Sequence, residues 1–399
     1  MRGARKLRET NNGDVVAIAA AYEMAPGRFP ELSTEDLFRK VLKGALAEWD
    51  IKPSDIDGLM THPSGTIAGY DIYFHDRLVT ELGLKAKFVE TLNLGGATYP
   101  AMVNRAANVI RAGRCKAVLC IGAGKFTKLS AGGGEMMARA ISDPHLEVPY
   151  GTWIPALYGL LASEYMADHD VTNEDIARMA VSERKWALLN PDARMRKDGP
   201  ISVDDVLGSR MISTPFHYLD CSVPSDGGGA VLVTSAAFAK KLTRQPAYVL
   251  GWGEAHLRGR VSEPGRLTDT GAIRSGAEAF ESAGLTPKQI DVAQLYDAFS
   301  VTPLVLLENL GFCKPGNAAK FVNSGATDPG GELPVNTYGG LLSFGHTGDA
   351  SGMSLVTAGA FQVMGTAGPN QVDNAKRVLI HGYGGIMYDH ATLILGRRP

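Results

Sequence analysis

The sequence predicts an α/β protein made of two halves that repeat one structural plan. Three observations support this prediction. Apolar β-branched runs alternate with segments of helical periodicity, short motifs of the first half recur in the second, and 47 glycines are spread through a 399-residue chain that is 45% hydrophobic. Helices that alternate with buried strands cover both faces of a sheet. A chain of this length can bury a large core.

The first half carries several apolar runs that predict strands. These runs are residues 15–19, 87–92, 117–122 and 230–234. An amphipathic helix is expected at 34–50, and a helix of small apolar residues follows the Gly-Gly turn after the strand at 87–92. Such a tight turn aims the N–H groups of the helix N-terminus at whatever lies beside it, so a nucleophile could be presented there.

Two matched motifs indicate an internal duplication. Residues 45–57 align with 279–291: in both copies a helix ends, proline opens a short turn, and Ile-Asp leads into a strand. Val118–Gly122 also matches Val378–Gly382, and the order is the same in both halves. We therefore predict a first half at 1–245 and a second half at 246–399.

The region from about 125 to 210 interrupts this alternation. It contains a run of three glycines at 132–134, an aromatic stretch at 150–165 and a charged helix at 173–190. We expect an inserted lobe over one half, where it can cover a substrate pocket. A contact between subunits is the alternative.

Charge, cysteines and motifs exclude several function classes. Forty basic and 42 acidic residues give a net charge of −2, which disfavours nucleic acid or an anionic membrane as the main partner. No apolar run approaches the ~20 residues of a spanning helix, and the basic N-terminus lacks an apolar signal region, so we expect a cytoplasmic protein. The four cysteines form no CxxC pair, and P-loop, GxGxxG, HExxH and GxSxG motifs are absent.

Four segments suggest a shared pocket, and together they resemble a known family. They are Asn93–Thr98, Tyr296–Phe299, Asn336–Gly348 and His381–Gly385. With the strand that begins Asp226-Gly-Gly-Gly-Ala-Val, their order and spacing resemble the thiolase superfamily over nearly the whole chain, in its lipid-transfer-protein (SCP2-thiolase-like) branch. The resemblance implies a thiolase fold, in which two duplicated α/β halves form a five-layered α-β-α-β-α structure.

The chain departs from thiolases at both catalytic cysteines. The resemblance places Gly96 and Gly382 at those positions, and glycine can carry neither an acyl group nor a proton. His346 corresponds to the histidine of the family's GHP motif, which orients the thioester carbonyl. Tyr296 stands where the (H/N)xxF motif commonly begins with histidine or asparagine.

This pattern is similar to that of the steroid side-chain aldolases, which lack the nucleophilic cysteine and cleave a β-hydroxyacyl-CoA by retro-aldol chemistry. Such a reaction needs a base, an oxyanion site and a proton donor. The resemblance implies that Tyr296 and His346 are catalytic. Histidine titrates near neutrality and could serve as the base. The aldolases have tyrosine at the place of His346, so which residue is acid and which is base stays open.

Further residues are expected around the substrate. The residues expected to bind the acyl-CoA are Gly95, Gly96, Asn336, Gly382, Gly384 and Gly385. Asn336 is equally compatible with a simple turn. We expect Asp297 to cap the next helix, and Tyr99 and Tyr383 to pack in the core although they flank the vacated cysteine positions.

The leading hypothesis is therefore a carbon–carbon lyase that cleaves a bulky β-hydroxyacyl-CoA, such as a steroid side chain, without a cysteine nucleophile. The CoA thioester is the substrate, and no tightly bound cofactor or metal is expected. Candidate cations for the CoA phosphates are Lys125, Lys128, Arg258 and Arg260. One alternative is a CoA-dependent acyltransferase or Claisen-type enzyme with Thr98 as nucleophile, and another is a non-catalytic acyl-CoA or lipid-binding scaffold.

The resemblance also implies partners. Proteins of this fold form homodimers or higher oligomers, and this branch often associates with a small DUF35 protein, an OB-fold with a zinc ribbon. Neither nucleic acid nor membrane insertion is expected.

Overall fold

The computed structural model describes residues 15–63, 74–127 and 133–399. Within these ranges the strands are β1 (Val16–Gly27), β2 (Gly58–Thr61), β3 (Phe88–Thr91), β4 (Ala117–Lys125), β5 (Met211–Ser213), β6 (Phe216–His217), β7 (Asp226–Ser235), β8 (Ala247–His256), β9 (Val292–Leu295), β10 (Arg377–Gly384) and β11 (Asp389–Gly396). The α-helices are α1 (Thr34–Trp49), α2 (Phe74–Glu81), α3 (Thr98–Arg111), α4 (Gly133–Ala140), α5 (Ile154–His169), α6 (Asn173–Leu189), α7 (Val203–Gly208), α8 (Ala236–Leu242), α9 (Ala272–Ala283), α10 (Thr302–Asn309), α11 (Ala318–Asn323) and α12 (Ser351–Met364).

The main sheet is mixed and repeats one pairing pattern on either side of its centre. Its strand order is β3-β2-β4-β7-β1-β8-β11-β10-β9. In the first half β1 and β4 pair antiparallel with β7, and β2 pairs parallel with β4. In the second half β8 and β10 pair antiparallel with β11, and β9 pairs parallel with β10. This symmetry confirms the predicted duplication.

The two sequence motifs that suggested the duplication occupy equivalent places. Each first motif ends a helix, passes through a short turn at Pro53–Asp55 or Pro287–Gln289, and enters β2 or β9. The second pair of motifs forms the equivalent strands β4 and β10. The division of the chain at residue 245 into two units stays a prediction.

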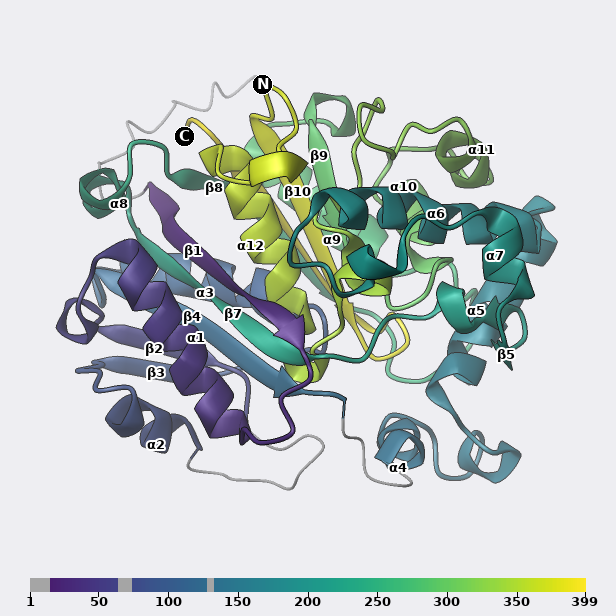
Figure 1. Ribbon diagram of the computed structural model, residues 1–399, viewed down its shortest axis with the longest axis horizontal. Helices are drawn as coiled ribbons and strands as arrows, with labels where there is room; N and C mark the ends of the chain where they lie inside the picture. Colours follow the sequence, from purple (N-terminus) through teal and green to yellow (C-terminus); the bar gives the residue numbers. More distant parts are fainter. Residues whose placement is uncertain (1–14, 64–73, 128–132) are drawn as a thin grey trace, which may run out of the picture.

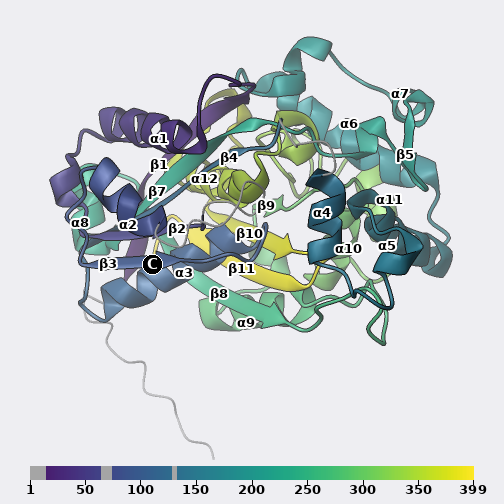
Figure 2. The same cartoon turned by 90° about the horizontal axis from the view of Figure 1, so that it is seen from below.

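The elements stack in five layers, as the resemblance implied. Helices α3 and α12 contact strands of both halves and each other, so they form the central layer. Helices α1 and α8 cover the first half, and α9 covers the second. Figure 2 shows this succession from α1, through the strands of each half and the central helices, to α9. The halves are joined where β1 meets β8, through the pairs Ala17–Tyr248 and Ile18–Ala247.

Local sequence explains why the central helix α3 forms between the strands of the two halves. Small residues such as Ala101, Ala106 and Ala107 alternate with Met102 and Val103, and all of these side chains are buried. Small side chains let the helix approach strands on both sides closely. An outer helix such as α1 instead buries one stripe and keeps a polar face in water.

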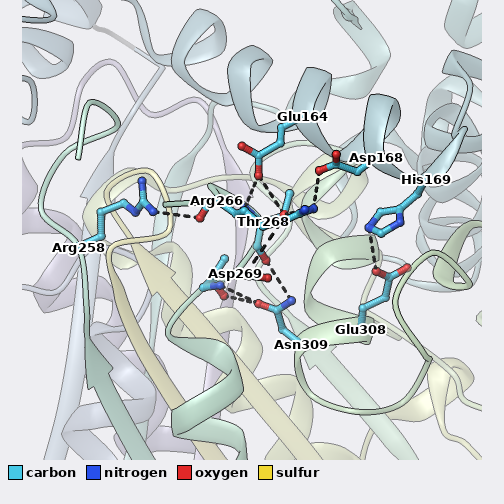
Figure 3. A network of polar contacts seen from close by, with 10 residues as sticks. Glu164, Asp168, His169, Arg258, Arg266, Thr268, Asp269, Glu308 and Asn309 are labelled. Atoms are coloured by element: carbon cyan, nitrogen blue, oxygen red, sulfur yellow. Dashed lines mark hydrogen bonds and ion pairs between the residues drawn. The ribbon is translucent and has the colours of Figure 1, made fainter. Parts of the chain in front are cut away.

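The chain between β4 and β7 forms a separate group of helices, α4 to α7, with the small hairpin β5–β6 (Figure 1). A polar network ties this group to the second half (Figure 3). Thr268 donates to Glu164 at 3.0 Å, and Arg266 pairs with Asp168 on the same helix, α5. Asn309 of α10 donates to the Thr268 carbonyl at 3.1 Å. The lobe is therefore fixed against the second half rather than free.

Some boundaries differ from those predicted. Strand β1 continues to Gly27 rather than ending near residue 19, because its later residues still pair with β7. Of the glycine run at 132–134, the first residue lies outside the described ranges. In the part of the chain that is described, no helix is both long and apolar enough to cross a bilayer.

Candidate active site

The two helices of the central layer begin at the same place in the molecule. Helix α3 begins at Thr98, directly after the turn that contains Gly96, and α12 begins at Ser351. These starts are adjacent, because a Cβ atom built on Gly352 would lie 2.4 Å from the Gly96 carbonyl oxygen. Both N-terminal ends carry partial positive charge, so this point favours a developing negative charge.

The two predicted catalytic residues meet at this point. Tyr296 directly follows β9, and its hydroxyl oxygen lies 3.0 Å from Nε2 of His346. The same hydroxyl lies 2.7 Å from Oγ of Ser351. Sequence reasoning identified the first two residues and missed Ser351. Its only signal was its place five residues after His346, at the start of a helix.

Hydrogen bonds that join His346 and Ser351 to the Gly348 backbone fix where the protons lie in the group formed by Tyr296, His346 and Ser351. Gly348 donates its backbone N–H to Nδ1 of His346 at 3.1 Å, so in the neutral imidazole the proton sits on Nε2. Ser351 donates its hydroxyl to the Gly348 carbonyl at 2.7 Å. The Tyr296 oxygen therefore accepts from His346 and donates to Ser351.

His346 is a neutral donor in this arrangement. Burial lowers the pKa of His346 to about 4, so its imidazole is uncharged at neutral pH. The Phe126 ring packs against it with 4.8 Å between centroids. With Nδ1 occupied and Nε2 protonated, His346 has no free lone pair for a proton. The structure thus favours hydrogen-bond donation over the role of base that its ordinary titration range suggested.

The glycine turn leaves no room for a side chain beside Tyr296. A Cβ atom on Gly96 would lie 2.3 Å from the Tyr296 ring, and one on Gly382 would lie 2.2 Å from the Gly96 carbonyl oxygen. Gly95 likewise approaches Gly384 so closely that its Cβ would lie 2.8 Å from the Gly384 Cα. The positions at which the resemblance places cysteines are therefore packed shut, one by a phenol ring and one by backbone.

The predicted acyl-CoA glycines separate into two groups. Gly96, Gly382 and Gly384 are buried against one another at the junction of the turn and β10, whereas Gly95 is exposed and Gly385 is half-buried. Of these five glycines, only Gly95 and Gly385 are accessible to solvent to this extent.

Asn336 supports the end of β9. Its Oδ1 accepts the backbone N–H of Leu295 at 2.7 Å, and its Nδ2 donates to Oε1 of Glu183 at 2.7 Å. The residue is fully buried and has a positive φ of 51°. Because both ends of its amide are engaged within the protein, Asn336 positions the backbone next to Tyr296.

Glu183 and Asp297 form a buried carboxyl pair behind the site. Burial raises the pKa of Glu183 well above its ordinary value, and burial raises the pKa of Asp297 to about 6. Asp297 accepts the Leu342 N–H at 3.0 Å in the turn at 340–344, so it does not cap the next helix, α10, as expected. The sequence signal for Glu183 was a charge on the apolar stripe of α6, in register with Ile176 and Ala187.

Other candidate residues have structural partners. Thr98 accepts the Leu94 N–H at 2.8 Å and is buried. Tyr99 and Tyr383 are buried in the core, and the Tyr383 ring packs 5.0 Å from that of Tyr296. All four cysteines are free thiols.

The candidate phosphate-binding cations are also engaged. Lys125 donates to the Pro30 and Leu32 carbonyls, and Arg260 lies 3.5 Å from Asp143. Arg258 donates to two carbonyls of its own loop, one of which is drawn in Figure 3. Lys128 lies outside the described residues. A CoA-phosphate role for these side chains stays a prediction.

A cavity of about 540 Å³ lies between β1, α12 and the end of α6. Among the described residues that line it are Glu23, Tyr338 and Phe344, but neither Tyr296 nor His346. Glu23 accepts hydrogen bonds from Ser354 and Thr357 of α12, and burial raises its pKa to about 7. Within the described ranges, no three His, Cys, Asp or Glu side chains are grouped to hold a metal ion.

Comparisons with known proteins agree with this architecture. The family model "Thiolase, N-terminal domain" matches residues 15–214, and "Thiolase C-terminal domain-like" matches residues 253–397. A steroid side-chain-cleaving aldolase of Thermomonospora curvata is 34% identical over 88% of this chain and 90% of its own length. A 17-hydroxy-3-oxo-4-pregnene-20-carboxyl-CoA lyase of Mycobacterium tuberculosis is 32% identical over 88% of this chain and 91% of its own.

A solved structure described as an Ltp2-ChsH2(DUF35) aldolase superposes with a TM-score of 0.83 at 29% identity. The match covers 97% of this chain and 99% of that one. Family models over both halves, and relatives above 30% identity along nearly the full length, lead to one conclusion. The chain belongs to the thiolase superfamily and is related to its steroid side-chain-cleaving aldolases and CoA lyases.

Proposed function

We propose that this protein is a thiolase-fold carbon–carbon lyase that cleaves a bulky β-hydroxyacyl-CoA, such as the CoA ester of a steroid side chain, by a retro-aldol reaction. The observation that carries the proposal is the 3.0 Å contact between the Tyr296 hydroxyl and His346 Nε2. It supports an acid/base role for Tyr296, beside the position at which the resemblance to thiolases puts a nucleophilic cysteine. The Tyr296 ring takes the space that a side chain at position 96 would need.

In the proposed reaction, Tyr296 takes one proton from the substrate and returns it to the product. The ionised Tyr296 oxygen removes the proton of the substrate β-hydroxyl, and the electrons of that O–H bond form a carbonyl. The bond between Cα and Cβ breaks, and its electrons pass into the thioester as an enolate. The ketone or aldehyde departs, and Tyr296 returns the proton to Cα, which gives the shorter acyl-CoA. This cycle needs no acyl-enzyme.

His346 stabilises the negative charge in this cycle. Its Nε2–H already points at the Tyr296 oxygen, and a neutral donor stabilises an oxyanion without surrendering its proton. The N-terminal ends of α3 and α12 add partial positive charge at the same point. The exposed Gly95 and the half-buried Gly385 are the part of the predicted glycine set that we assign to acyl-CoA contact.

The experiment is incubation of the purified protein, with any copurifying partner, with a panel of β-hydroxyacyl-CoAs that includes steroid side chains. We expect a ketone or aldehyde and a shortened acyl-CoA, detected by mass spectrometry. Tyr296→Phe should lower kcat by about 10²- to 10⁴-fold, the usual contribution of a general acid–base group.

Tyr383→Phe is the matched control for this experiment. It removes a hydroxyl that is buried next to the Tyr296 ring and has no hydrogen-bond partner among the described residues. It should retain kcat within a few-fold. A panel left uncleaved, or full activity in Tyr296→Phe, would contradict the proposal.

The two alternative functions give different results in the same preparation. Acyl transfer through Thr98 requires a hydroxyl that already accepts the Leu94 N–H, and it predicts an acyl adduct on the intact protein. A binding scaffold predicts tight acyl-CoA association without turnover. We expect neither the adduct nor binding without cleavage.

We also propose that the chain forms a homodimer or higher oligomer and associates with a small DUF35 protein. The support is the likeness to a structure described as an Ltp2-ChsH2(DUF35) aldolase. Copurification of a tagged chain from its native source tests this proposal. A chain that is fully active without any partner would contradict it.

A further inference from the structure

We infer that Ser351 is a positioning residue that controls the ionisation of Tyr296 through one reversible hydrogen bond. In the resting state Ser351 accepts a hydrogen bond from the phenol, and after ionisation its own hydroxyl donates one to the phenolate. The inference deepens the proposed function and rests on it for the use of the phenolate. Its central measurement is the ionisation of one tyrosine, which needs no substrate. Failure of the inference and failure of the lyase proposal can therefore be told apart.

The first step in the argument is the limited capacity of a hydroxyl group. Ser351 is 1% exposed, and its Oγ has one proton and two lone pairs. It lies 2.7 Å from the Gly348 carbonyl oxygen, which can only accept. The serine proton is therefore committed to that carbonyl, and Oγ accepts from the Tyr296 hydroxyl at 2.7 Å.

The second step is that Gly348 fixes both the His346 imidazole and the Ser351 hydroxyl, the two described hydrogen-bond partners of the Tyr296 oxygen. The N–H of Gly348 sets the tautomer of His346, and its carbonyl sets the direction of the Ser351 hydroxyl. The Tyr296 oxygen thus contacts His346, which always donates, and Ser351, whose hydroxyl can either accept or donate. A histidine nitrogen cannot exchange these roles without a change of tautomer, whereas a serine hydroxyl exchanges them by rotation about one bond.

The third step concerns the ionised state. When Tyr296 loses its proton, a serine oxygen that still accepted would place its lone pairs against a negative charge. Rotation of the Ser351 O–H from the Gly348 carbonyl to the phenolate replaces that repulsion with a second donor beside His346 Nε2–H. Hydrogen bonds to the charged form of an acid favour ionisation. Ser351 is therefore expected to lower the pH at which Tyr296 ionises.

The experiment measures tyrosinate absorbance during alkaline titration of the full-length protein. Subtraction of the Tyr296→Phe titration isolates the signal of this one residue. In a Ser351→Ala background, corrected with the double variant Ser351→Ala/Tyr296→Phe, the midpoint should rise by about one pH unit, as expected for the loss of one hydrogen bond to a charged group. A midpoint within roughly 0.2 pH unit of the wild-type value would overturn the inference.

Ser354→Ala is the matched control. Ser354 lies one turn further along α12, and its hydroxyl donates to Oε1 of Glu23 at 2.6 Å rather than to the phenol. It should leave the Tyr296 midpoint unchanged. Ser351→Thr retains the hydroxyl and should restore the wild-type midpoint. If Ser351→Ala does not fold, Ser351→Cys fills the same space with a weaker donor and should raise the midpoint as well.

The activity measurement separates the two proposals. If the lyase is active, the limb of kcat/KM that rises with pH should move upward in Ser351→Ala by the same amount as the spectroscopic midpoint. If the protein unfolds at a lower pH than that at which Tyr296 ionises, the shift of this limb replaces the spectroscopic midpoint as the test of Ser351. A shifted midpoint in a protein that cleaves no substrate supports Ser351 and removes the lyase proposal. If the wild-type protein cleaves substrate but neither the Tyr296 midpoint nor the rising limb of kcat/KM moves in Ser351→Ala, the lyase proposal is supported and the inference about Ser351 is overturned.

Discussion

The starts of α3 and α12 occupy equivalent places in the two halves but differ in chemistry. The approach to α3, through Gly95, Gly96 and Ala97, carries no functional side chain. The approach to α12 carries His346 and ends at Ser351, both of which contact Tyr296. The duplicated scaffold therefore brings two helix N-termini to one point, and of these two only α12 and its approach supply the polar side chains His346 and Ser351. The other supplies the space in which the Tyr296 ring lies.

The largest expected effect comes from filling that space. In Gly96→Ala, the added Cβ would meet the Tyr296 ring at 2.3 Å, so the ring must shift and disturb the contacts of its hydroxyl with His346 and Ser351. We expect kcat to fall at least about 100-fold, comparable to the loss of an acid–base group, and stability to fall by about 1–3 kcal/mol, as in overpacked cores. Steady-state kinetics and urea unfolding measure the two effects.

A double variant tests whether this damage acts through Tyr296. Gly96→Ala/Tyr296→Ala should recover much of the stability that the single Gly96→Ala variant loses, because the clashing ring is gone. Gly208→Ala is the control, since a Cβ there meets nothing within 4 Å among the described residues. Strictly additive effects of the two active-site changes would contradict the packing argument.

The next effect comes from the residue that orders the approach to α12. Gly348 has a positive φ of 64°, and a Cβ there would lie 3.3 Å from the Phe126 ring. Gly348→Ala should move the peptide that fixes His346 and Ser351, and lower kcat by about tenfold or more. Gly284→Ala adds left-handed strain at the same φ of 64°, at the exposed end of α9, where a Cβ meets nothing within 4 Å in the described structure. It should destabilise the protein by about 1 kcal/mol and leave kcat unchanged. Equal kcat in both variants would count against the role of Gly348.

A smaller effect concerns the pH dependence of stability. The pKa of His346 is about 4 in the folded protein, whereas an unfolded imidazole has a pKa of about 6.5. Between these values the unfolded chain binds more protons, so the stability from the neutral His346 is complete above about pH 6.5 and is lost as the pH falls toward 4. The stability difference between wild type and His346→Gln should shrink by about 1–2 kcal/mol between pH 7 and pH 5. A difference that is the same at both pH values would show that His346 titrates alike in both states.

The smallest effect has the opposite sign and comes from the link between β1 and α12. Burial raises the pKa of Glu23 to about 7, so its contribution is present below its unfolded pKa of about 4.5 and is lost as the pH rises through 7. Glu23→Gln should therefore gain stability relative to wild type by about 1 kcal/mol between pH 5 and pH 8. Urea unfolding at both pH values measures this gain, and a relative stability that falls with rising pH would contradict the shift.

Much of the architecture could be predicted because it depends on local pattern. Apolar runs and helical periodicity placed the first-half strands β1, β3, β4 and β7 and the central helix α3, and the matched motifs indicated two equivalent halves. The second central helix, α12, was not predicted. Boundaries were less accurate: β1 continues eight residues beyond its predicted end at residue 19, because strand pairing extends past the apolar run. The pairing of Tyr296 with His346 followed from family motifs 50 residues apart.

The remaining features of the site depend on contacts between distant segments. Ser351 and Glu183 belong to none of the four segments quoted from the sequence. Gly348 and Asp297 do, but their contacts with His346 and Glu183 depend on atoms that meet only after the chain folds. The role of His346 changed for the same reason, since a backbone N–H from Gly348 occupies the nitrogen that a base would use.

The sequence by itself determined the α/β class, the duplication, the family and the absence of cysteine at both thiolase positions, because these are properties of residue order. Only the tertiary structure decided why those positions are closed: the Tyr296 ring fills the space beside Gly96, and the Gly96 carbonyl fills the space beside Gly382. It also decided the direction of the hydrogen bonds that join Tyr296 to His346 and Ser351. Packing volume and proton position are set by the distances between folded segments, which residue order alone does not contain.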